Sequence, residues 1–101
     1  MRIEKMEHSE ETKNAVWKKG KEAPPNNPEV YRKDECGAWI TRSEYGNRNS
    51  PYGWEIDHIF PGGSHDISNL RPLQWENNVG KSDGKLKGDI VADGIKNVRR
   101  G

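Results

Sequence analysis

Two short apolar segments, separated by a glycine-rich break, lie at the centre of this 101-residue chain. Residues 53–60 alternate Trp, Ile and His with Glu, Asp and Ile, a pattern that predicts a β-strand. Pro and Gly at 61–63 end this strand sharply, because both residues favour turns. Residues 69–75 predict a second strand, and residues 75–81 a helix. This order predicts an α+β fold built around an antiparallel two-stranded hairpin.

The segment before this centre predicts a helical extension. Ser9 is a favourable N-cap, two glutamates follow it, and two lysines and a glycine end the segment, so a helix is expected over about residues 9–19. The Pro- and Asn-rich residues 23–28 predict an extended linker or turn, and residues 37–41 a short strand. We expect one domain over residues 1–101.

The composition leaves little material for a large core. Hydrophobic residues make up 30% of the chain and charged residues 33%, and the mean hydropathy is −1.17. A short polar domain is marginally stable unless a disulfide, a metal or a partner stabilises it. Cys36 is the single cysteine, so neither an intrachain disulfide nor a cysteine-rich zinc site can form. We expect Cys36 to be a buried small residue, the tryptophans to lie in the core, and oligomerisation or nucleic-acid binding to add stability.

No sequence segment predicts membrane insertion or export. No run approaches the roughly 18 apolar residues that a membrane span needs, and residues 1–11 lack the apolar stretch of a signal peptide. A single thiol also fits a reducing compartment. The expected location is therefore the cytoplasm.

Positive charge is concentrated near the C-terminus. The whole chain carries a formal net charge of +1, which is small for a nucleic-acid-binding protein. Residues 81–101 hold six basic and three acidic side chains, a local excess of three positive charges. The part from residue 84 to 101 has little regular pattern, and partial disorder is expected there. A basic tail that contacts phosphates and a solvated terminus are both compatible with this stretch.

The central segment carries the side chains that phosphodiester hydrolysis needs: Asp57-His58, Asn69, Asn78 and Lys81. This reaction requires a base that deprotonates water and a positive charge that neutralises the phosphoryl and leaving oxygens. Histidine is largely neutral at physiological pH and suits the first task, and a hard cation such as Mg²⁺ or Mn²⁺ suits the second. Asp57 and Asn78 offer one carboxylate and one amide oxygen to such a cation, a weak site that substrate phosphate and water would complete.

Three sequence elements carry a resemblance to a known family. They are Trp54-Glu55-Ile56-Asp57-His58-Ile59, Asp66-Ile67-Ser68-Asn69-Leu70 and Asn78-Val79-Gly80-Lys81-Ser82-Asp83. Their order and spacing resemble the HNH, or ββα-metal, endonucleases, and the last element is similar to that in the HNH domain of RNA-guided CRISPR nucleases. Residues 16–20, 32–34 and 37–40 also resemble small stand-alone HNH nicking enzymes of bacteria and phages. The resemblance implies a ββα-metal core over about residues 53–83, with a two-stranded antiparallel hairpin and a metal-binding helix.

The resemblance implies a role for each polar residue of the motif. His58 is expected to be the general base, and Asp57 and Asn78 to hold one Mg²⁺ or Mn²⁺ ion. Asn69 is expected to brace the loop behind His58, and Lys81 is a candidate phosphate contact. Many family members bind structural zinc through two Cys-x-x-Cys pairs. This chain lacks them, so no structural zinc is expected and apolar packing should replace it.

The resemblance also implies a substrate. Double-stranded DNA should be cut with weak sequence preference to 5′-phosphate and 3′-hydroxyl ends, in a bacterial cell or a phage-infected host. One active site nicks one strand, and only a suitable homodimer would cut both. The candidate DNA contacts outside the motif are basic side chains: Arg48, Arg71, Lys85, Lys87, Arg99 and Arg100. A catalytically inactive DNA-binding module and an RNA-directed nuclease remain alternatives.

Three details of the site stay open in the sequence. Asn77 competes with Asn78 as the metal ligand, although the spacing to the following lysine favours Asn78. Asp57 and His58 are neighbours, and neighbouring strand residues point to opposite faces, so both serve one site only if the strand ends or bulges there. The remaining histidines, such as His65, are expected to be exposed and inert.

Overall fold

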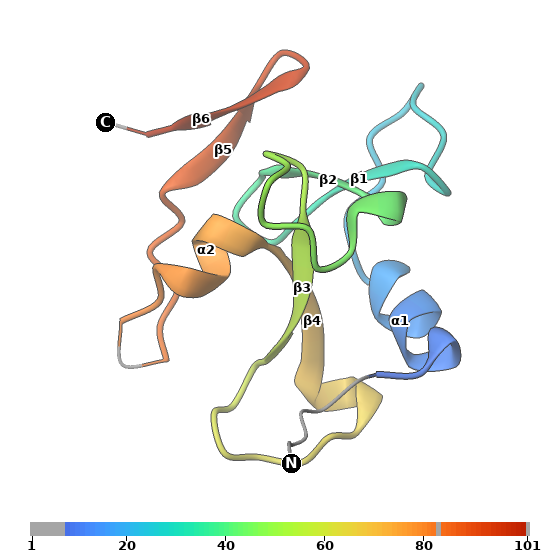
Figure 1. Ribbon diagram of the computed structural model, residues 1–101, viewed down its shortest axis with the longest axis vertical. Coiled ribbons are helices and arrows are strands. Elements are labelled where there is room, and N and C mark those ends of the chain that lie inside the picture. The colour runs from blue at the N-terminus through green and yellow to red at the C-terminus, as the bar shows by residue number, and fades with distance from the viewer. Residues whose placement is uncertain (1–7, 83, 101) are drawn as a thin grey trace.

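Helix α1, Glu10–Trp17, begins where the sequence predicts it. Ser9 caps this helix, because its hydroxyl oxygen accepts a 3.0 Å hydrogen bond from the Thr12 backbone N–H. In the computed structural model, which describes residues 8–82 and 84–100, α1 precedes three antiparallel strand pairs and a second helix (Figure 1). The last residue of the predicted motif, at position 83, lies outside the described residues.

Each strand pair is a separate two-stranded antiparallel sheet. The strands are β1 Tyr31–Lys33, β2 Trp39–Thr41, β3 Trp54–His58, β4 Leu70–Gln74, β5 Ile90–Asp93 and β6 Lys96–Arg99, with 3₁₀ turns η1 Arg42–Glu44 and η2 Ile67–Asn69 before β3 and β4. Helix α2, Trp75–Val79, follows β4 directly. The predicted α+β class and the central antiparallel hairpin are therefore confirmed. In the part of the chain that the structure describes, neither helix has the length and apolar character that crossing a membrane requires.

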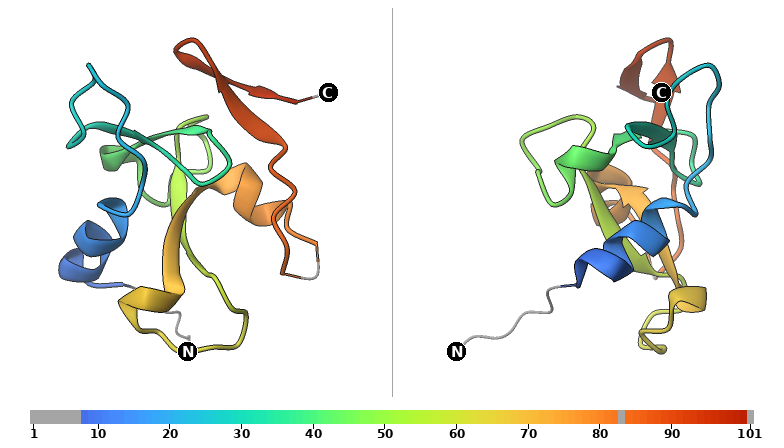
Figure 2. Two further views of the ribbon diagram at one scale, coloured as in Figure 1. Left: turned by 180° about the vertical axis from the view of Figure 1, so that it is seen from behind. Right: turned by 90° about the vertical axis from the view of Figure 1, so that its right-hand side faces the viewer.

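The β3–β4 hairpin lies in the middle of the molecule, with α1 on one side and α2 on the other (Figures 1 and 2). Helix α1 packs on β4, and α2 contacts both strands. The strand register pairs Asp57 with Arg71 and His58 with Leu70. The radius of gyration of the Cα atoms, 13.1 Å, agrees with the value of about 13 Å for a compact 100-residue domain.

A small core rich in tryptophan joins α1 to the central hairpin. The Trp17 and Trp54 rings lie 5.3 Å apart between centroids, and both side chains are buried. The other buried residues of this cluster are aliphatic: Val16, Ile40 and Leu70. The prediction that the tryptophans lie in the core holds for these two, whereas Trp39 and Trp75 are only half-buried.

A buried carboxylate joins the β1–β2 turn to the end of β4 and to α2. The Asp34 side chain is fully buried, and its Oδ1 accepts hydrogen bonds from the backbone N–H groups of Cys36 at 2.9 Å and Ala38 at 2.8 Å. Its Oδ2 accepts from the Gln74 backbone N–H at 2.9 Å and from Asn77 Nδ2 at 3.1 Å. Four donors on three segments therefore converge on one side chain.

Residues 84–100 do not fit the expectation of little regular structure, which was wrong. Strands β5 and β6 pair over four residues each, and Asn77 anchors them by exchanging hydrogen bonds of 2.9 and 3.0 Å with the backbone of Ile90. The Asn97 side chain bonds the backbone N–H and C=O of Trp39 at 2.7 and 2.9 Å. Sequence periodicity does not reveal this hairpin, because amide side chains from distant positions fix it. The sequence also does not predict strand β1, because three residues are too few to show an alternating pattern.

The Asp34 network predicts a large loss of stability in Asp34→Ala. The substitution leaves four donors without their acceptor, and each buried unsatisfied group costs about 1–3 kcal/mol. The free energy of unfolding in urea should fall by about 3 kcal/mol or more. Asp93→Ala, which removes an exposed carboxylate at the end of β5, is the matched control and should change it by less than about 0.5 kcal/mol. Equal losses in both variants would contradict the role assigned to Asp34.

Candidate functional site

One face of β3 carries two carboxylates. Glu55 and Asp57 are two residues apart, so both side chains point to the same face, about 7 Å apart along the strand. Helix α2 and the turn after it lie along this face. Asn78 Nδ2 donates to Glu55 Oε1 at 2.8 Å, and Lys81 Nζ bonds Asp57 Oδ1. The structure thus brings Asn78 and Lys81 to the face that carries Asp57. Asn78 contacts Glu55, however, and Lys81 contacts Asp57.

Asp57 is a buried, charge-neutralised carboxylate. Asp57 is only 5% exposed. Arg71 Nε donates to Asp57 Oδ2 at 2.9 Å, and Lys81 binds Oδ1. Arg71 also pairs with Glu35 at 3.2 Å. Arg71 is itself buried between these carboxylates, so its predicted contact with DNA does not fit this placement. No local pattern in the sequence predicts the role of Glu35, which comes from the distant β1–β2 turn.

The donor set on this face fits a hard divalent cation in kind. Asp57 supplies carboxylate oxygens, Asn78 supplies an amide oxygen, and Mg²⁺ and Mn²⁺ prefer such oxygen ligands. Arg71 binds Asp57 Oδ2, and the Lys81 ammonium already occupies Oδ1. A divalent ion would compete with Lys81 for it. Among the described residues, no three His, Cys, Asp or Glu side chains form a metal-holding group, so phosphate and water would have to complete the shell.

Glu55, next to this site, is held ionised by its neighbours. Arg48 pairs with it through two hydrogen bonds, Nε to Oε2 at 2.5 Å and Nη2 to Oε1 at 2.9 Å. Burial alone would raise the pKa of the Glu55 carboxyl, but the hydrogen bonds from Arg48 and Asn78, together with the Arg48 charge, hold the pKa below its usual value. Glu55 was not predicted as a site residue, although its two-residue offset from Asp57 in a strand is the signal that places both on one face.

His58 ends β3 and faces the following loop rather than Asp57. Its Nε2 lies 2.8 Å from Nδ1 of His65, and the two rings meet edge to face with centroids 4.8 Å apart. One ring must donate and the other accept, so the contact fixes the orientation of the His58 ring. The strand ends at His58, as a shared role with Asp57 requires, although His58 contacts His65 while Asp57 contacts Arg71 and Lys81. His65 is exposed as expected, and it contacts His58, which the sequence does not indicate.

Asn69 ties together the loop that follows β3. Its Oδ1 accepts a hydrogen bond from the Phe60 backbone N–H at 2.9 Å, and its Nδ2 donates to the Ser64 carbonyl at 2.8 Å. A Cβ atom at Gly63 would come within 2.9 Å of Asn69 Nδ2, so only glycine leaves room for this amide. The Asn69 side chain therefore fixes the loop that leads away from His58, the position in which the motif resemblance puts a bracing asparagine.

Asn77 cannot take the place of Asn78 as a ligand in this fold. It is 1% exposed, and both ends of its amide bond the backbone of Ile90 while Nδ2 also donates to Asp34. The structure therefore separates the two neighbours. Asn77 joins α2 to the core and to β5, and Asn78 lies on the β3 face.

The remaining candidate DNA contacts are side chains at the surface. Lys85, Lys87 and Arg100 are exposed, although Arg100 also donates to the Gly88 carbonyl at 2.9 Å. The Arg99 side chain is 61% exposed. It pairs weakly with Glu76 at 3.5 Å and with Asp89, the residue before β5, at 3.6 Å. Arg48 is exposed but already pairs with a glutamate. Arg99 and Arg100 thus reach the segment that carries Lys85 and Lys87, because they bond Asp89 and the Gly88 carbonyl.

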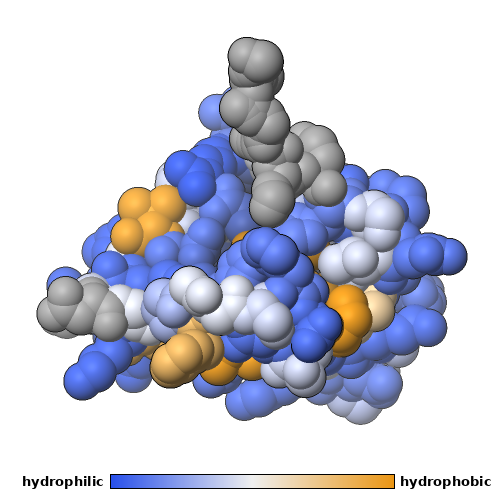
Figure 3. Space-filling view, turned by 90° about the horizontal axis from the view of Figure 1, so that it is seen from below, coloured by the Kyte–Doolittle hydropathy of each residue, from blue (hydrophilic) through white to orange (hydrophobic). Residues whose placement is uncertain are grey.

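The surface near the His58 loop is mainly polar. Seen from below, where this loop lies in Figure 1, the molecule is largely hydrophilic with separate apolar patches (Figure 3). Phe60 is the most exposed of the loop's large hydrophobic side chains, at 72%. A polar face of this kind suits a polar partner better than an apolar one. Comparison with protein families, with curated proteins and with solved structures finds no match for this chain.

Cys36, next to the Asp34 network, is half-buried rather than fully buried as predicted. Burial, and then the nearby charges of Asp34 and Glu35, raise the pKa of its thiol to about 11. The thiolate is the reactive form, so very little of the folded protein is reactive at pH 8.

We expect iodoacetamide to alkylate Cys36 in the folded protein roughly 10- to 100-fold more slowly at pH 8 than in the protein unfolded in urea. The alkylation rate should rise steadily with pH up to about 11, because deprotonation of the thiol forms the reactive thiolate. Mass spectrometry of timed aliquots measures both rates. Equal rates in folded and unfolded protein would show that the fold does not suppress the thiolate.

Proposed function

We propose that this protein is a divalent-metal-dependent endonuclease of the HNH type that hydrolyses phosphodiester bonds of DNA. The observation that carries the proposal is the arrangement around β3. His58 ends the strand, Asn69 braces the loop behind it, and the side chains of Asp57 and Asn78 lie on the face covered by α2. A hairpin followed by a helix with these residues agrees with the ββα-metal motif that the sequence resembles.

In this proposal His58 is the base. In the tautomer in which Nε2 donates its proton to His65 Nδ1, Nδ1 of His58 is left to accept a proton from the attacking water. The His65 contact and the loop held by Asn69 orient the ring for this transfer. A divalent cation bound through Asp57 and Asn78 would neutralise the negative charge that develops on the phosphoryl and leaving oxygens. Lys81, once released from Asp57, is long enough to turn its ammonium toward a phosphate.

The proposed mode of DNA binding is weak and depends on salt. The formal net charge is +1, and the group of Lys85, Lys87, Arg99 and Arg100 is small, so few phosphates are neutralised at once. Helix α2 has only five residues and presents few side chains suited to reading base edges. One site per chain would nick one strand, and a homodimer would be needed to cut both.

The assay that tests the proposal is the conversion of supercoiled plasmid to open circles by purified protein with Mg²⁺ or Mn²⁺, and its loss in EDTA. His58→Ala should lower the rate by roughly 10²- to 10⁴-fold, because a general base contributes about that much. Binding of a labelled duplex, measured by fluorescence anisotropy, should persist. His8→Ala is the matched control, since this histidine lies outside the site. If His58→Ala kept more than about half of the wild-type rate, the assignment of the base would be wrong.

A second prediction concerns the metal. Asn78→Ala should raise the metal concentration that gives half-maximal nicking, because it removes one of the two proposed protein ligands. Val79→Ala is the matched control, since Val79 is the next residue of α2 and is 57% exposed. Titrations of nicking rate against Mn²⁺ for both variants measure the difference. Unchanged metal dependence in Asn78→Ala would remove this residue from the proposed site.

A further inference from the structure

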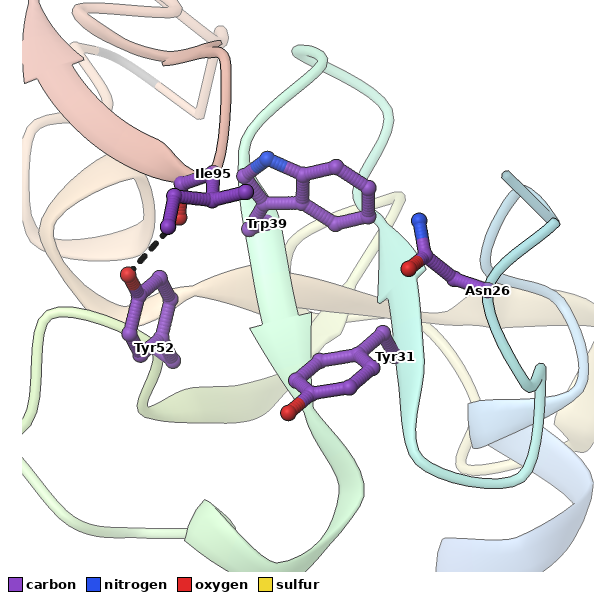
Figure 4. Close-up of a pocket in the computed structure, with 5 residues that line it drawn as sticks. All are labelled: Asn26, Tyr31, Trp39, Tyr52 and Ile95. Carbon is purple, nitrogen blue, oxygen red and sulfur yellow. Dashed lines mark hydrogen bonds between the residues drawn. The ribbon is translucent and has the colours of Figure 1, made fainter. Parts of the chain in front are cut away.

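A pocket lined by aromatic side chains lies at the opposite end of the molecule from the His58 loop. Its volume is about 260 Å³, and its walls are Asn26, Tyr31, Trp39, Tyr52 and Ile95. The residues come from four segments: the turn before β1, the β1–β2 pair, the loop before β3, and the β5–β6 turn (Figure 4). Figure 1 places these segments at the top and the loop after β3 at the bottom. The proposed chemistry uses none of them.

Two of the rings are held rigidly by their polar atoms. Trp39 Nε1 donates to the Gly94 carbonyl at 2.7 Å, and the Tyr52 hydroxyl donates to the Ile95 carbonyl at 2.8 Å. Both bonds go to the backbone of the β5–β6 turn, so the turn and the two rings fix one another. The polar atoms of these rings are occupied in the fold, and what the rings offer a ligand is their apolar faces.

The walls of the pocket offer two aromatic rings and one polar edge to a planar polar ring. Figure 4 shows the Trp39 ring above this space, the Tyr31 ring below it, and the Asn26 carboxamide at one side with its oxygen directed inward. Tyr31 is 43% exposed, so a ligand can reach its face. Aromatic faces stack on a planar ring, and an amide oxygen accepts a hydrogen bond from a ring N–H.

The charge next to the pocket favours a neutral ring that carries an anion. The Lys33 ammonium lies 4.8 Å from the centroid of the Trp39 ring, so this ring already has a cation on it. A cationic ligand such as a quaternary ammonium group would be repelled by it, although aromatic pockets otherwise suit such groups. The same ammonium attracts a phosphate attached to a stacked ring.

We propose that this pocket binds one unpaired base of single-stranded DNA, stacked between Trp39 and Tyr31, with Lys33 on an adjacent phosphate. A base inside a duplex has both faces covered by its neighbours, so the pocket accepts a base only where a strand is open, as at a nick or a frayed end. The choice of DNA as the source of the base rests on the proposed function. The stacking site itself is separate from the cleavage site.

The test is anisotropy of a labelled 12-nucleotide single strand and of the matching duplex, in EDTA so that neither is cut. Tyr31→Ala should bind the single strand roughly 5- to 100-fold more weakly, as expected for one lost base stack, and should change duplex binding less than about twofold. Tyr31→Phe keeps the ring and should bind as the wild type does. Phe60→Ala removes an exposed aromatic ring at the other end of the molecule and should have no effect.

Unchanged single-strand binding in Tyr31→Ala would overturn the pocket proposal, and so would an equal loss in Phe60→Ala. Specific binding of a trimethyllysine peptide that Tyr31→Ala abolishes would overturn it in favour of a cation-binding pocket. The plasmid assay on the same proteins separates this proposal from the proposed function. Nicking by the wild type with no effect of Tyr31→Ala on single strands rejects the pocket alone. A Tyr31-dependent single-strand affinity without any nicking rejects the nuclease alone.

Discussion

The buried carboxylate of Asp34 is the interaction on which the rest of this structure depends. A chain of this size with 30% hydrophobic residues and a single cysteine needs some other constraint to hold its parts together. Asp34 binds donors from its own turn, from the last residue of β4 and from α2. Asn77 extends the network to β5 through Ile90. Hydrogen bonds to one carboxylate and one amide thus connect three strand pairs and a helix.

This network also sets the geometry of the candidate site. Gln74, bonded to Asp34 through its backbone, caps α2 with its side chain, which accepts hydrogen bonds from the N–H groups of Glu76 and Asn77. A five-residue helix is not stable alone, so these bonds determine where it begins and how it is turned. Because Asn77 is directed into the core, Asn78 lies on the β3 face, and Lys81 reaches Asp57. At the C-terminal end of β3, the Asn69 side chain holds the loop beside His58 in place through hydrogen bonds to its backbone.

Local patterns in the sequence predict the elements whose signals are local. The Ser9 cap, the strand at residues 54–58 and the helix after β4 follow from capping chemistry, alternation and turn residues. The polar partners could not be predicted, because Asp34, Asn77 and Arg71 are polar residues that become buried only through contacts far along the chain. For the same reason the basic stretch after residue 84 looked like a tail, whereas amide side chains hold it as a hairpin. For the candidate site, the sequence led to Asp57, Asn78 and Lys81 as proposed residues, but it did not reveal Glu55 or its hydrogen bonds to Arg48 and Asn78.

Hydrolysis of DNA at a metal-assisted site is the central claim, and the ends of the cut strand test it most directly. Open circular plasmid made by the protein with Mn²⁺ should be resealed by DNA ligase without any other treatment, because the proposed chemistry leaves a 5′-phosphate beside a 3′-hydroxyl. Nicks that resist ligation until the ends are repaired would contradict that chemistry. A protein that leaves the plasmid supercoiled with every divalent ion, or that cuts only RNA, would contradict the claim itself.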